Sequence, residues 1–486
     1  MNPFRAPWQR LSRLLKPPSR EEIVSGPPLR TMARIGVPAA FGTLLFTLYN
    51  LANAYWVGKL PPEASGAALA GIQVSWPIVW LLIAFVIGFG GASVAALVSQ
   101  YTGANRLKEA NLAFNQFAAL AMVTGVVLGV VGYLISPWFL RILVHDPSIA
   151  DAASSYLEII FLGLPTMILP GLFFSTLSAT GDTLAAVVVN GAGALLNVGL
   201  DAVFVLGWGP VPRMGIVGAA YATVICQGLV TIAFFILFAK GRGFLRLRLE
   251  DLRPRWEWMK RGLEIGLPAG VGQTATAFGF TIMTAVIARL PNPQATLAGY
   301  GVGDRLLGLL FIATEGLSIG LTTMVGQALG AGLLDRTREL LKKGLAGLMA
   351  ILAVEAVFLV TLRYTLLGFF APGRPDVVEI GADFVQAFGL SLPFLGIFFA
   401  TIAVYRAAGR NRPAMYLELA RLWGLRVPLS WTLAYPLHLG AGGVWWGMSA
   451  SNAVSGLLAI VALTRPGWRR VVIEPVPEEV TTRAEP

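Results

Sequence analysis

The sequence predicts an all-α integral membrane protein with twelve transmembrane helices in two six-helix lobes, related by a pseudo-two-fold axis along the membrane normal. Of the 486 residues, 56% are hydrophobic and only 13% are charged, whereas a soluble protein carries about 25% charged residues. Uncharged stretches that reach the roughly 20 residues needed for a membrane-spanning helix recur from residue 35 almost to residue 464. The third observation is an internal repeat, each copy of which contains six of these stretches.

Helices are favoured over a β-barrel because the apolar runs are continuous and lack the alternation typical of barrel strands. The 55 glycines and 30 prolines, many of them within the runs, allow such helices to bend and pack closely. We expect spans near residues 35–58, 68–100, 112–135, 153–180, 183–208, 214–240, 262–289, 295–329, 340–367, 380–408, 413–436 and 441–464.

Cysteine and histidine are too scarce for most metal or redox chemistry. Cys226 is the only cysteine, so no intrachain disulfide can form, and the two histidines, His145 and His438, lie far apart in the chain. The N-terminal segment MNPFRAPWQRLSRLLK lacks the apolar run of a cleavable signal. It is either a short helix on the inner leaflet or a disordered basic tail.

Lysine and arginine are concentrated in every second loop. If the N-terminus is cytoplasmic, the inside segments are 1–34, 101–111, 181–182, 240–261, 330–343, 406–412 and 465–486, and the outside loops hold only Lys59, Arg141, Arg213, Arg289, Arg363 and Arg374. Basic loops stay in the cytoplasm. We therefore expect a multi-pass protein of a bacterial or archaeal cytoplasmic (inner) membrane with both termini cytoplasmic. The net charge of +11 reflects this bias rather than nucleic-acid binding, because the basic residues are spread over seven segments and do not cluster on one face.

Four short motifs occur twice in the same order, about 228 residues apart. They are IGVPA at 35–39 and IGLPA at 265–269, VSQYTGAN at 98–105 and VGQALGAG at 325–332, LGLP at 162–165 and LSLP at 390–393, and SATGD at 178–182 and RAAGR at 406–410. Each copy holds an even number of spans, so both halves cross the membrane in the same sense. Parallel repeats of this kind are typical of secondary transporters.

The repeat divides the chain into a basic segment (1–34), a first lobe (35–240), a cytoplasmic linker (241–261), a second lobe (262–464) and a cytoplasmic tail (465–486). The sequence has no GxxxxGK[ST] phosphate loop and no soluble domain large enough for a nucleotide, so the expected energy source is an ion gradient. Clustered histidines, a DxxD pair and a nucleophile motif are also missing, which argues against an enzyme. No cofactor is expected besides Na⁺ or H⁺ as the coupling ion.

Several stretches resemble the multidrug and toxic compound extrusion (MATE) family. They are PAAFGTLLFTLYNLANAYWVGKL followed by ALAG, NVGLDAVFVLGWG, GIVGAAYATVICQ and GQALGAG, and in order they fall within residues 30–465. The resemblance implies two six-helix lobes around a V-shaped cavity, and export of organic compounds in exchange for Na⁺ or H⁺. Its superfamily includes lipid-linked oligosaccharide flippases, which usually have more than twelve spans. Export of a lipid-linked precursor is therefore the alternative function.

Three polar side chains share one face of the apolar span 183–208. Asn190, Asn197 and Asp201 are seven and four residues apart, which places them on one side of a helix. A charged residue at the bilayer centre costs about 2.5–3.5 kcal/mol on insertion scales, so such a residue normally faces protein or water and often has a function. The structural alternative is that Asp201 caps or packs a helix near the outer loop.

Oxygen-bearing side chains of two further spans accompany this face. In the first span Tyr49 and Asn53 stack on one helical face, and Thr223 adds a hydroxyl group in the sixth span. The resemblance implies that Asn197, Asp201 and Thr223 belong to a cation-binding cluster. It also places Asn53 where relatives usually carry an aspartate.

Asp201 would then be the only carboxylate of the cluster. A Na⁺ ion held by Asp201, Asn197, Asn53 and Thr223 suits the preference of hard cations for oxygen, whereas a proton on Asp201 suits burial. Both modes remain open, and so does weak coupling or a specialised substrate. Tyr49 and Asn190 complete the candidate coupling residues.

The second lobe lacks the acids that the NorM branch of the family uses. The residue seven positions after Pro268 is Ala275, and the stretch 394–405 contains no acid. We therefore expect the DinF-like branch, whose ion site lies in the first lobe. By the repeat, the NVGLD face corresponds to the region around Leu425, where Arg421 and Arg426 stand instead.

Five further side chains are candidates for the substrate cavity. Asp304 and Glu315 share a helical face and can attract cationic drugs, although Asp304 could instead form a structural ion pair with a neighbouring arginine. Asn50 is polar, and Phe280 and Met283 offer the flat or soft surfaces that suit varied organic cations. A residue such as either of the last two more often faces lipid or the core.

Together these features predict a secondary active multidrug efflux antiporter that works by alternating access. We expect it to export amphipathic, cationic organic compounds, to act as a monomer, and to contact small-molecule drugs and membrane lipids but no nucleic acid.

Overall fold

Twelve helical runs occupy the predicted spans in the computed structural model, which describes residues 17–60, 62–143, 146–208 and 211–473. Within these ranges no residue forms a β-strand. The first lobe contains α3 (Pro28–Gly58), α4 (Pro62–Val86), the π-helical η1 (Ile87–Gly91), α5 (Ala92–Gly103), α6 (Leu107–Leu143), α7 (Pro147–Leu162), α8 (Leu164–Thr180), α9 (Thr183–Leu206) and α10 (Gly215–Lys240). The second contains α11 (Trp256–Ile287), α12 (Pro293–Gly330), α13 (Leu334–Phe370), α14 (Pro375–Gly389), α15 (Leu392–Ala407), α16 (Asn411–Leu419), the π-helical η3 (Ala420–Arg426), α17 (Val427–Ala434) and α18 (Gly440–Thr464).

Three short helices lie outside the spans. The first, α2 (Arg20–Ser25), precedes the first lobe, η2 (Leu249–Leu252) lies in the linker, and η4 (Pro466–Arg469) follows α18. In α2 the Ser19 hydroxyl accepts from the backbone N–H of Glu22, and the Glu22 carboxylate accepts from the backbone N–H of Ser19. This reciprocal pairing satisfies two donors that a helix start leaves free.

The helices are long and apolar enough for a membrane protein. Among the described residues, nine helices could cross a bilayer by length and composition, and two more spans are the bent pairs α7–α8 and α14–α15, with angles of 57° and 55°. The twelfth run, from Asn411 to Ala434, is continuous but passes through the π-helical η3. The predicted all-helical, multi-span fold class is confirmed.

Proline explains why the two bent pairs fall at equivalent places of the repeat. Pro165 and Pro393 stand in the first turns of α8 and α15, within the motifs LGLP and LSLP. A proline lacks the backbone N–H that would continue the preceding helix, and it disfavours helical geometry in the residue before it. One helix therefore ends and another starts at a new angle.

Each lobe has its own hydrophobic core. That of the first lobe includes Phe114, Phe173 and Phe234, contributed by α6, α8 and α10. The core of the second lobe is built mainly from α12 to α15 and α18, and it also takes Ile23 of α2 and Met32 of α3. The helix α2 and the first turns of α3 are thus packed onto the second lobe.

Near α2, the lobes are joined by two hydrogen bonds that the repeat relates to each other. The side-chain amide of Gln100, in α5, donates to the backbone carbonyl of Ala407 over 2.8 Å, and that of Gln327, in α12, donates to the carbonyl of Ala179 over 2.9 Å. The glutamines belong to one pair of repeated motifs and the acceptors to another. We call these two bonds the clasp, and the end of the bundle that carries them the α2 end.

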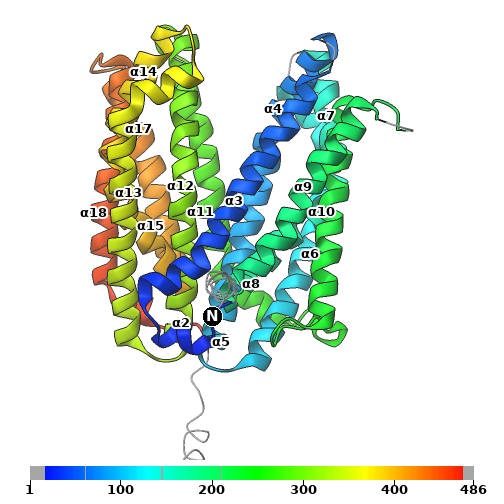
Figure 1. Cartoon of the computed structure of the whole chain (residues 1–486), viewed down its shortest axis with the longest axis vertical. Coiled ribbons are helices and arrows are strands. Elements are labelled where there is room, and N and C mark those ends of the chain that lie inside the picture. Colours follow the sequence, from blue (N-terminus) through cyan, green and yellow to red (C-terminus); the bar gives the residue numbers. More distant parts are fainter. Residues whose placement is uncertain (1–16, 61, 144–145, 209–210, 474–486) are drawn as a thin grey trace, which may run out of the picture.

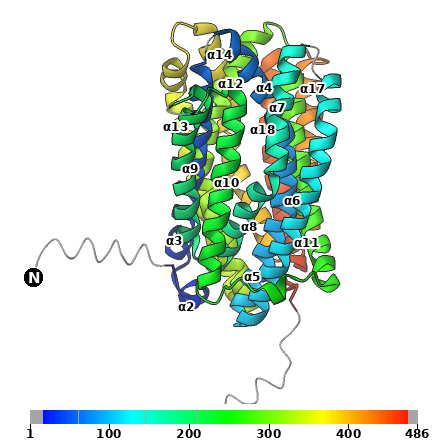
Figure 2. The same ribbon diagram turned by 90° about the vertical axis from the view of Figure 1, so that its right-hand side faces the viewer.

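Close backbone contacts flank the clasp. Gly103 lies against the backbone of Gln327, and Gly330 lies against that of Gln100, so a Cβ atom at either glycine would overlap with the opposite lobe. Figure 1 shows the lobes close together at the α2 end and diverging toward the end that carries α4 and α14. Figure 2 shows that the helices of both lobes run along the same long axis.

Candidate functional site

The NVGLD stretch lies in the middle and second half of α9, whose two ends are defined by local geometry. Asp182 accepts from the backbone N–H of Ala185 at the start of the helix, and Gly207 ends it with φ +77°, a conformation that favours glycine. The 24 residues between them hold an uninterrupted α-helix. Asn197 and Asp201 are therefore one turn apart on the same face, and that face is turned into the first lobe, with exposed fractions of 1% and 0%.

Both side chains are buried with few partners. Neither carboxylate oxygen of Asp201 bonds to any described residue, and the amide group of Asn197 has only the weakly bonding thiol of Cys226 beside it. An unpaired buried polar group costs several kcal/mol, and an unpaired buried charge costs far more. The carboxylate oxygens of Asp201 and the amide oxygen of Asn197 are therefore available to bind a cation, and a proton could instead neutralise the carboxylate.

Hydroxyl and thiol groups from three other helices surround the pair. The hydroxyl groups of Tyr49, in α3, and Thr223, in α10, share a hydrogen bond of 3.2 Å. Tyr49, Tyr156 of α7 and Cys226 of α10 each interact electrostatically with Asp201. Helices distant in sequence therefore converge on one carboxylate.

A small cavity of about 60 Å³ adjoins Asn197. It is lined by Tyr49, Asn190 and Asn197, together with Gln227 and apolar groups of α3, α9 and α10. The side-chain nitrogen of Asn190 donates to the carbonyl of Ala186 over 2.9 Å, which leaves its carbonyl oxygen available toward the cavity. A volume of this size holds an ion or one or two water molecules, but no drug.

The structure thus brings together five of the predicted coupling residues, Tyr49, Asn190, Asn197, Asp201 and Thr223. Asn53, one turn beyond Tyr49, is partly exposed and is not among the residues that line the cavity. The side chain of Asn50 lies outside what the structure describes.

Two neighbours of the site were not predicted from the sequence. Tyr156 is 5% exposed and Cys226 is 3% exposed. For α10 a signal existed, because Thr223, Cys226, Gln227 and Val230 recur at the three- and four-residue spacing of one helical face. For Tyr156 there was none, since no periodicity within α7 shows which helix it meets.

The second lobe has a different arrangement at the equivalent place. Arg426 is 2% exposed, and its guanidinium donates to Ser451 Oγ over 3.2 Å and to Asn452 Oδ1 over 2.5 Å. Arg421 is 6% exposed and stacks over the Phe398 ring at 4.9 Å. Both are buried inside the lobe, so they do not line a basic central cavity of the kind a lipid-linked pyrophosphate would need.

The candidate cavity residues fall into different environments. Glu315 of α12 is exposed, and Thr43 of α3 donates to it over 3.4 Å, so it lies between the lobes. Asp304 is exposed and forms no ion pair within 4.0 Å in the described part of the chain, although Arg426 and Arg305 attract it. Phe280 is 41% exposed, with the Arg426 guanidinium 5.9 Å from its ring centre. The prediction for Met283 was wrong, because Met283 is fully buried in the core of the second lobe.

Comparison with known proteins gives the same architecture. The family model described as MatE matches residues 38–203 and again 268–432, once in each lobe. The chain is 26% identical over 450 residues to the probable multidrug resistance protein YpnP of Bacillus subtilis, a match that covers 92% of this chain and 97% of YpnP. It is also 26% identical over 421 residues to an FAD transporter of Shewanella oneidensis, with 85% and 89% covered.

A solved structure shares the fold. The outward-facing conformation of a multidrug resistance MATE family transporter superposes with a TM-score of 0.83 at 21% identity, covering 92% of this chain and 97% of that one. Because the family model matches the greater part of the chain, once per lobe and in the predicted order, this protein belongs to the MatE family of membrane transporters and is not an enzyme.

Proposed function

We propose that this chain is an antiporter that exports amphipathic organic cations in exchange for Na⁺ or H⁺, with the coupling ion bound at Asp201. The observation that carries the proposal is the fully buried carboxylate of Asp201, neither oxygen of which has a partner among the described residues. Such a group needs a cation or a proton, and its occupancy changes as the surroundings change.

The side chains around Asp201 suit either ion. A proton neutralises the carboxylate directly, whereas Na⁺ would use the oxygens of Asp201 and Asn197 and the hydroxyl pair Tyr49–Thr223. Asp201 is the only carboxylate in this group, so one bound monovalent cation balances its charge. Both modes place the ion on α9, against α3 and α10.

Export requires that ion binding change the arrangement of the lobes. α3 carries Tyr49 of the ion site, and it also packs on α12 of the second lobe, where Gly36 lies against the backbone of Gly316. An ion that binds more tightly in one arrangement shifts the equilibrium toward it. The clasp at the α2 end is the contact that has to open when the lobes rock apart there.

The loop charges support a cytoplasmic α2 end in the inner membrane of a bacterium or an archaeon. The segments at that end, which are 17–34, 101–111, 240–261, 330–343, 406–412 and 465–473, together carry most of the described Lys and Arg. In this orientation the closed α2 end is the inner side, and the diverging end opens outward. A monomer suffices, because each lobe supplies its own core and the clasp lies within one chain.

Charge between the lobes supports a cationic substrate. Glu315 and Asp304 are both exposed on α12, and their negative charge attracts organic cations. The names of the relatives do not identify the substrate, since the one named for multidrug resistance and the one named for FAD transport are both 26% identical to this chain over most of its length.

The decisive experiment is efflux from proteoliposomes with the Na⁺ and proton gradients imposed separately. We expect an inward gradient of one of the two ions to drive export of a fluorescent organic cation. Export of FAD but of no cation would disprove the substrate class, and equal efflux without either gradient would disprove ion coupling.

A further inference from the structure

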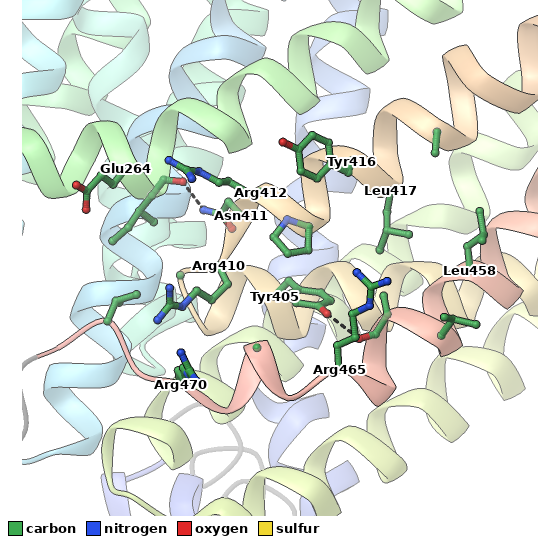
Figure 3. Close-up of a pocket in the computed structure, with 18 residues that line it drawn as sticks. Glu264, Tyr405, Arg410, Asn411, Arg412, Tyr416, Leu417, Leu458, Arg465 and Arg470 are labelled. Atoms are coloured by element: carbon green, nitrogen blue, oxygen red, sulfur yellow. Dashed lines mark hydrogen bonds between the residues drawn. The ribbon is translucent and has the colours of Figure 1, made fainter.

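A second, much larger cavity lies in the second lobe at the α2 end, away from Asp201. Its volume is about 850 Å³. It is enclosed by the first turns of α11, by the loop between α15 and α16, and by the end of α18 with the chain that follows it. Figure 3 shows these segments with the side chains that line the cavity.

One side of this cavity is strongly basic. Arg410, Arg412, Arg465 and Arg470 all line it, and all four are exposed. Within the described ranges none of the four guanidinium groups takes part in an ion pair or a hydrogen bond. The one carboxylate in the lining is that of Glu264, which Figure 3 places at the edge of the group, across the cavity from Arg465.

The frame of the cavity is held in place by its own hydrogen bonds. The side chain of Asn411 donates to the carbonyl of Ile265 over 2.6 Å, and the hydroxyl group of Tyr405 donates to the carbonyl of Ala462 over 2.8 Å. Both bonds are drawn in Figure 3. The nearby Arg406 is paired with Glu418 over 2.7 Å. The four arginines form none of these bonds, so the cavity wall is fixed while their guanidinium groups stay free to bind a ligand.

The other side of the cavity is apolar. Leu458 and Val461, on the membrane-spanning α18, are 41% and 56% exposed, and Tyr416 of α16 is 62% exposed. A phosphate needs the arginines but not this wall, whereas acyl chains need the wall. A ligand with a charged phosphate at one end and hydrocarbon at the other matches both sides.

We infer that this cavity binds an anionic phospholipid, with the headgroup phosphate on the arginines and the acyl chains along α16 and α18. Basic pockets between helices near the cytoplasmic surface suit such headgroups, and arginine is the residue best shaped for phosphate. The inference needs only that the chain spans a membrane, and it is independent of ion coupling at Asp201.

The bound lipid would also touch the clasp. Val472 lines the cavity, and its backbone N–H donates over 3.0 Å to Gln100 Oε1, the same side chain that bonds to Ala407. A lipid on Arg465 and Arg470 thus holds the segment that orients Gln100. Anionic lipid is expected to favour the arrangement in which the α2 end is closed.

The test is lipid binding to the full-length protein in detergent, measured by native mass spectrometry with phosphatidylglycerol and with phosphatidylcholine. An arginine that contacts the headgroup is expected to contribute about fivefold in affinity for anionic lipid, as arginines near a membrane surface do, so R410Q/R412Q/R465Q is expected to weaken phosphatidylglycerol binding at least tenfold. The matched control R246Q/R248Q/R253Q removes three exposed linker arginines outside the cavity and should bind like the parent. If the triple variant is not monodisperse, the single variant Arg412→Gln should still lose a few-fold.

Four outcomes would overturn the inference. They are unchanged binding by the cavity variants, equal binding of phosphatidylcholine, full competition by inorganic phosphate, and a tenfold gain when Glu474, Glu478, Glu479 and Glu485 are changed to glutamine in the full chain. The third would indicate a site for free anions, and the fourth a site filled by the acidic end of the chain itself. Asp201→Asn should bind lipid like the parent, which separates this result from any failure of the proposed ion coupling.

Discussion

The α9 run of the first lobe and the α16–η3–α17 run of the second lobe are equivalent in the repeat but opposite in chemistry. The two family matches begin at residues 38 and 268 and end at 203 and 432, which places Asn197 opposite Arg426 or Val427. One run buries a carboxylate that has no hydrogen-bond partner among the described residues, and the other buries a guanidinium with hydrogen bonds to Ser451 and Asn452. A buried acid without a partner is suited to an exchangeable ion, whereas a buried base with permanent partners is suited to a structural role.

The backbones differ in the same way. α9 is a regular α-helix, whereas its counterpart passes through the seven-residue π-helical η3, which begins next to Arg421 and ends at Arg426. A π-helical turn reorients side chains relative to the rest of the helix. The two lobes therefore share one architecture, and the local difference in sequence is the reason that we propose ion coupling for the first lobe alone.

The largest effect is expected for Asp201→Asn. The asparagine fills the same space but cannot bind a proton or balance a cation, so gradient-driven efflux in proteoliposomes should be lost. Thermal stability should stay the same or rise, because an unpaired buried charge is removed. The control Asp151→Asn makes the same change on an exposed part of α7 and should leave efflux intact. Undiminished efflux by D201N would show that the buried carboxylate of the first lobe does not couple ion entry to export.

A large effect of another kind is expected for Gly103→Ala and Gly330→Ala, which test the symmetric part of the molecule. Each added Cβ meets the backbone of the opposite lobe, so both variants should hold the α2 end apart and reduce transport. The distance between spin labels at Lys108 and Lys342 should increase in both. Gly58→Ala and Gly368→Ala, where a Cβ meets nothing within 4 Å, should behave like the parent. An effect in only one of the first two variants would show that the clasp is not symmetric.

A moderate effect on stability is expected for Arg426→Gln. The substitution leaves polar groups of Ser451 and Asn452 without their partner, which should lower the free energy of unfolding by about 1–3 kcal/mol. The Tm in detergent measures this loss. Arg421→Gln should cost less, because Arg421 Nε has no hydrogen-bond partner among the described residues. If R426Q changed the ion dependence of efflux as D201N is expected to, the division of roles between the lobes would be wrong.

The smallest effect is expected for Tyr156→Phe. Only the hydroxyl group is lost, which interacts electrostatically with Asp201 without a hydrogen bond, so the apparent affinity for the coupling ion should fall by less than about fivefold, the effect expected of one hydrogen bond. The ion concentration that gives half-maximal efflux measures it. Tyr133→Phe, on an exposed part of α6, is the control. An unchanged ion affinity would remove Tyr156 from the site and leave α7 a purely structural neighbour.

Much of the fold was predictable because it follows from local and repeated patterns. Apolar runs of membrane-spanning length mark the spans, and the paired motifs LGLP and LSLP mark the bends, since proline acts on its own neighbours. The face shared by Asn190, Asn197 and Asp201 follows from helical periodicity alone. Met283 shows the limit, because periodicity gives a residue's face but not whether that face meets a cavity or a core.

By itself the sequence determined the helical membrane fold, its duplication and the placement of one acid, Asp201, in an apolar span, because each depends on residues close together or on matching motifs. Only the tertiary structure decided that Asp201 is buried without a partner, that Tyr156 and Cys226 lie beside it, and that Arg426 is satisfied within its own lobe. It also gathered four arginines from two separate segments into one cavity. These features depend on which helices pack against each other, and helix packing is determined by contacts between residues far apart in the chain.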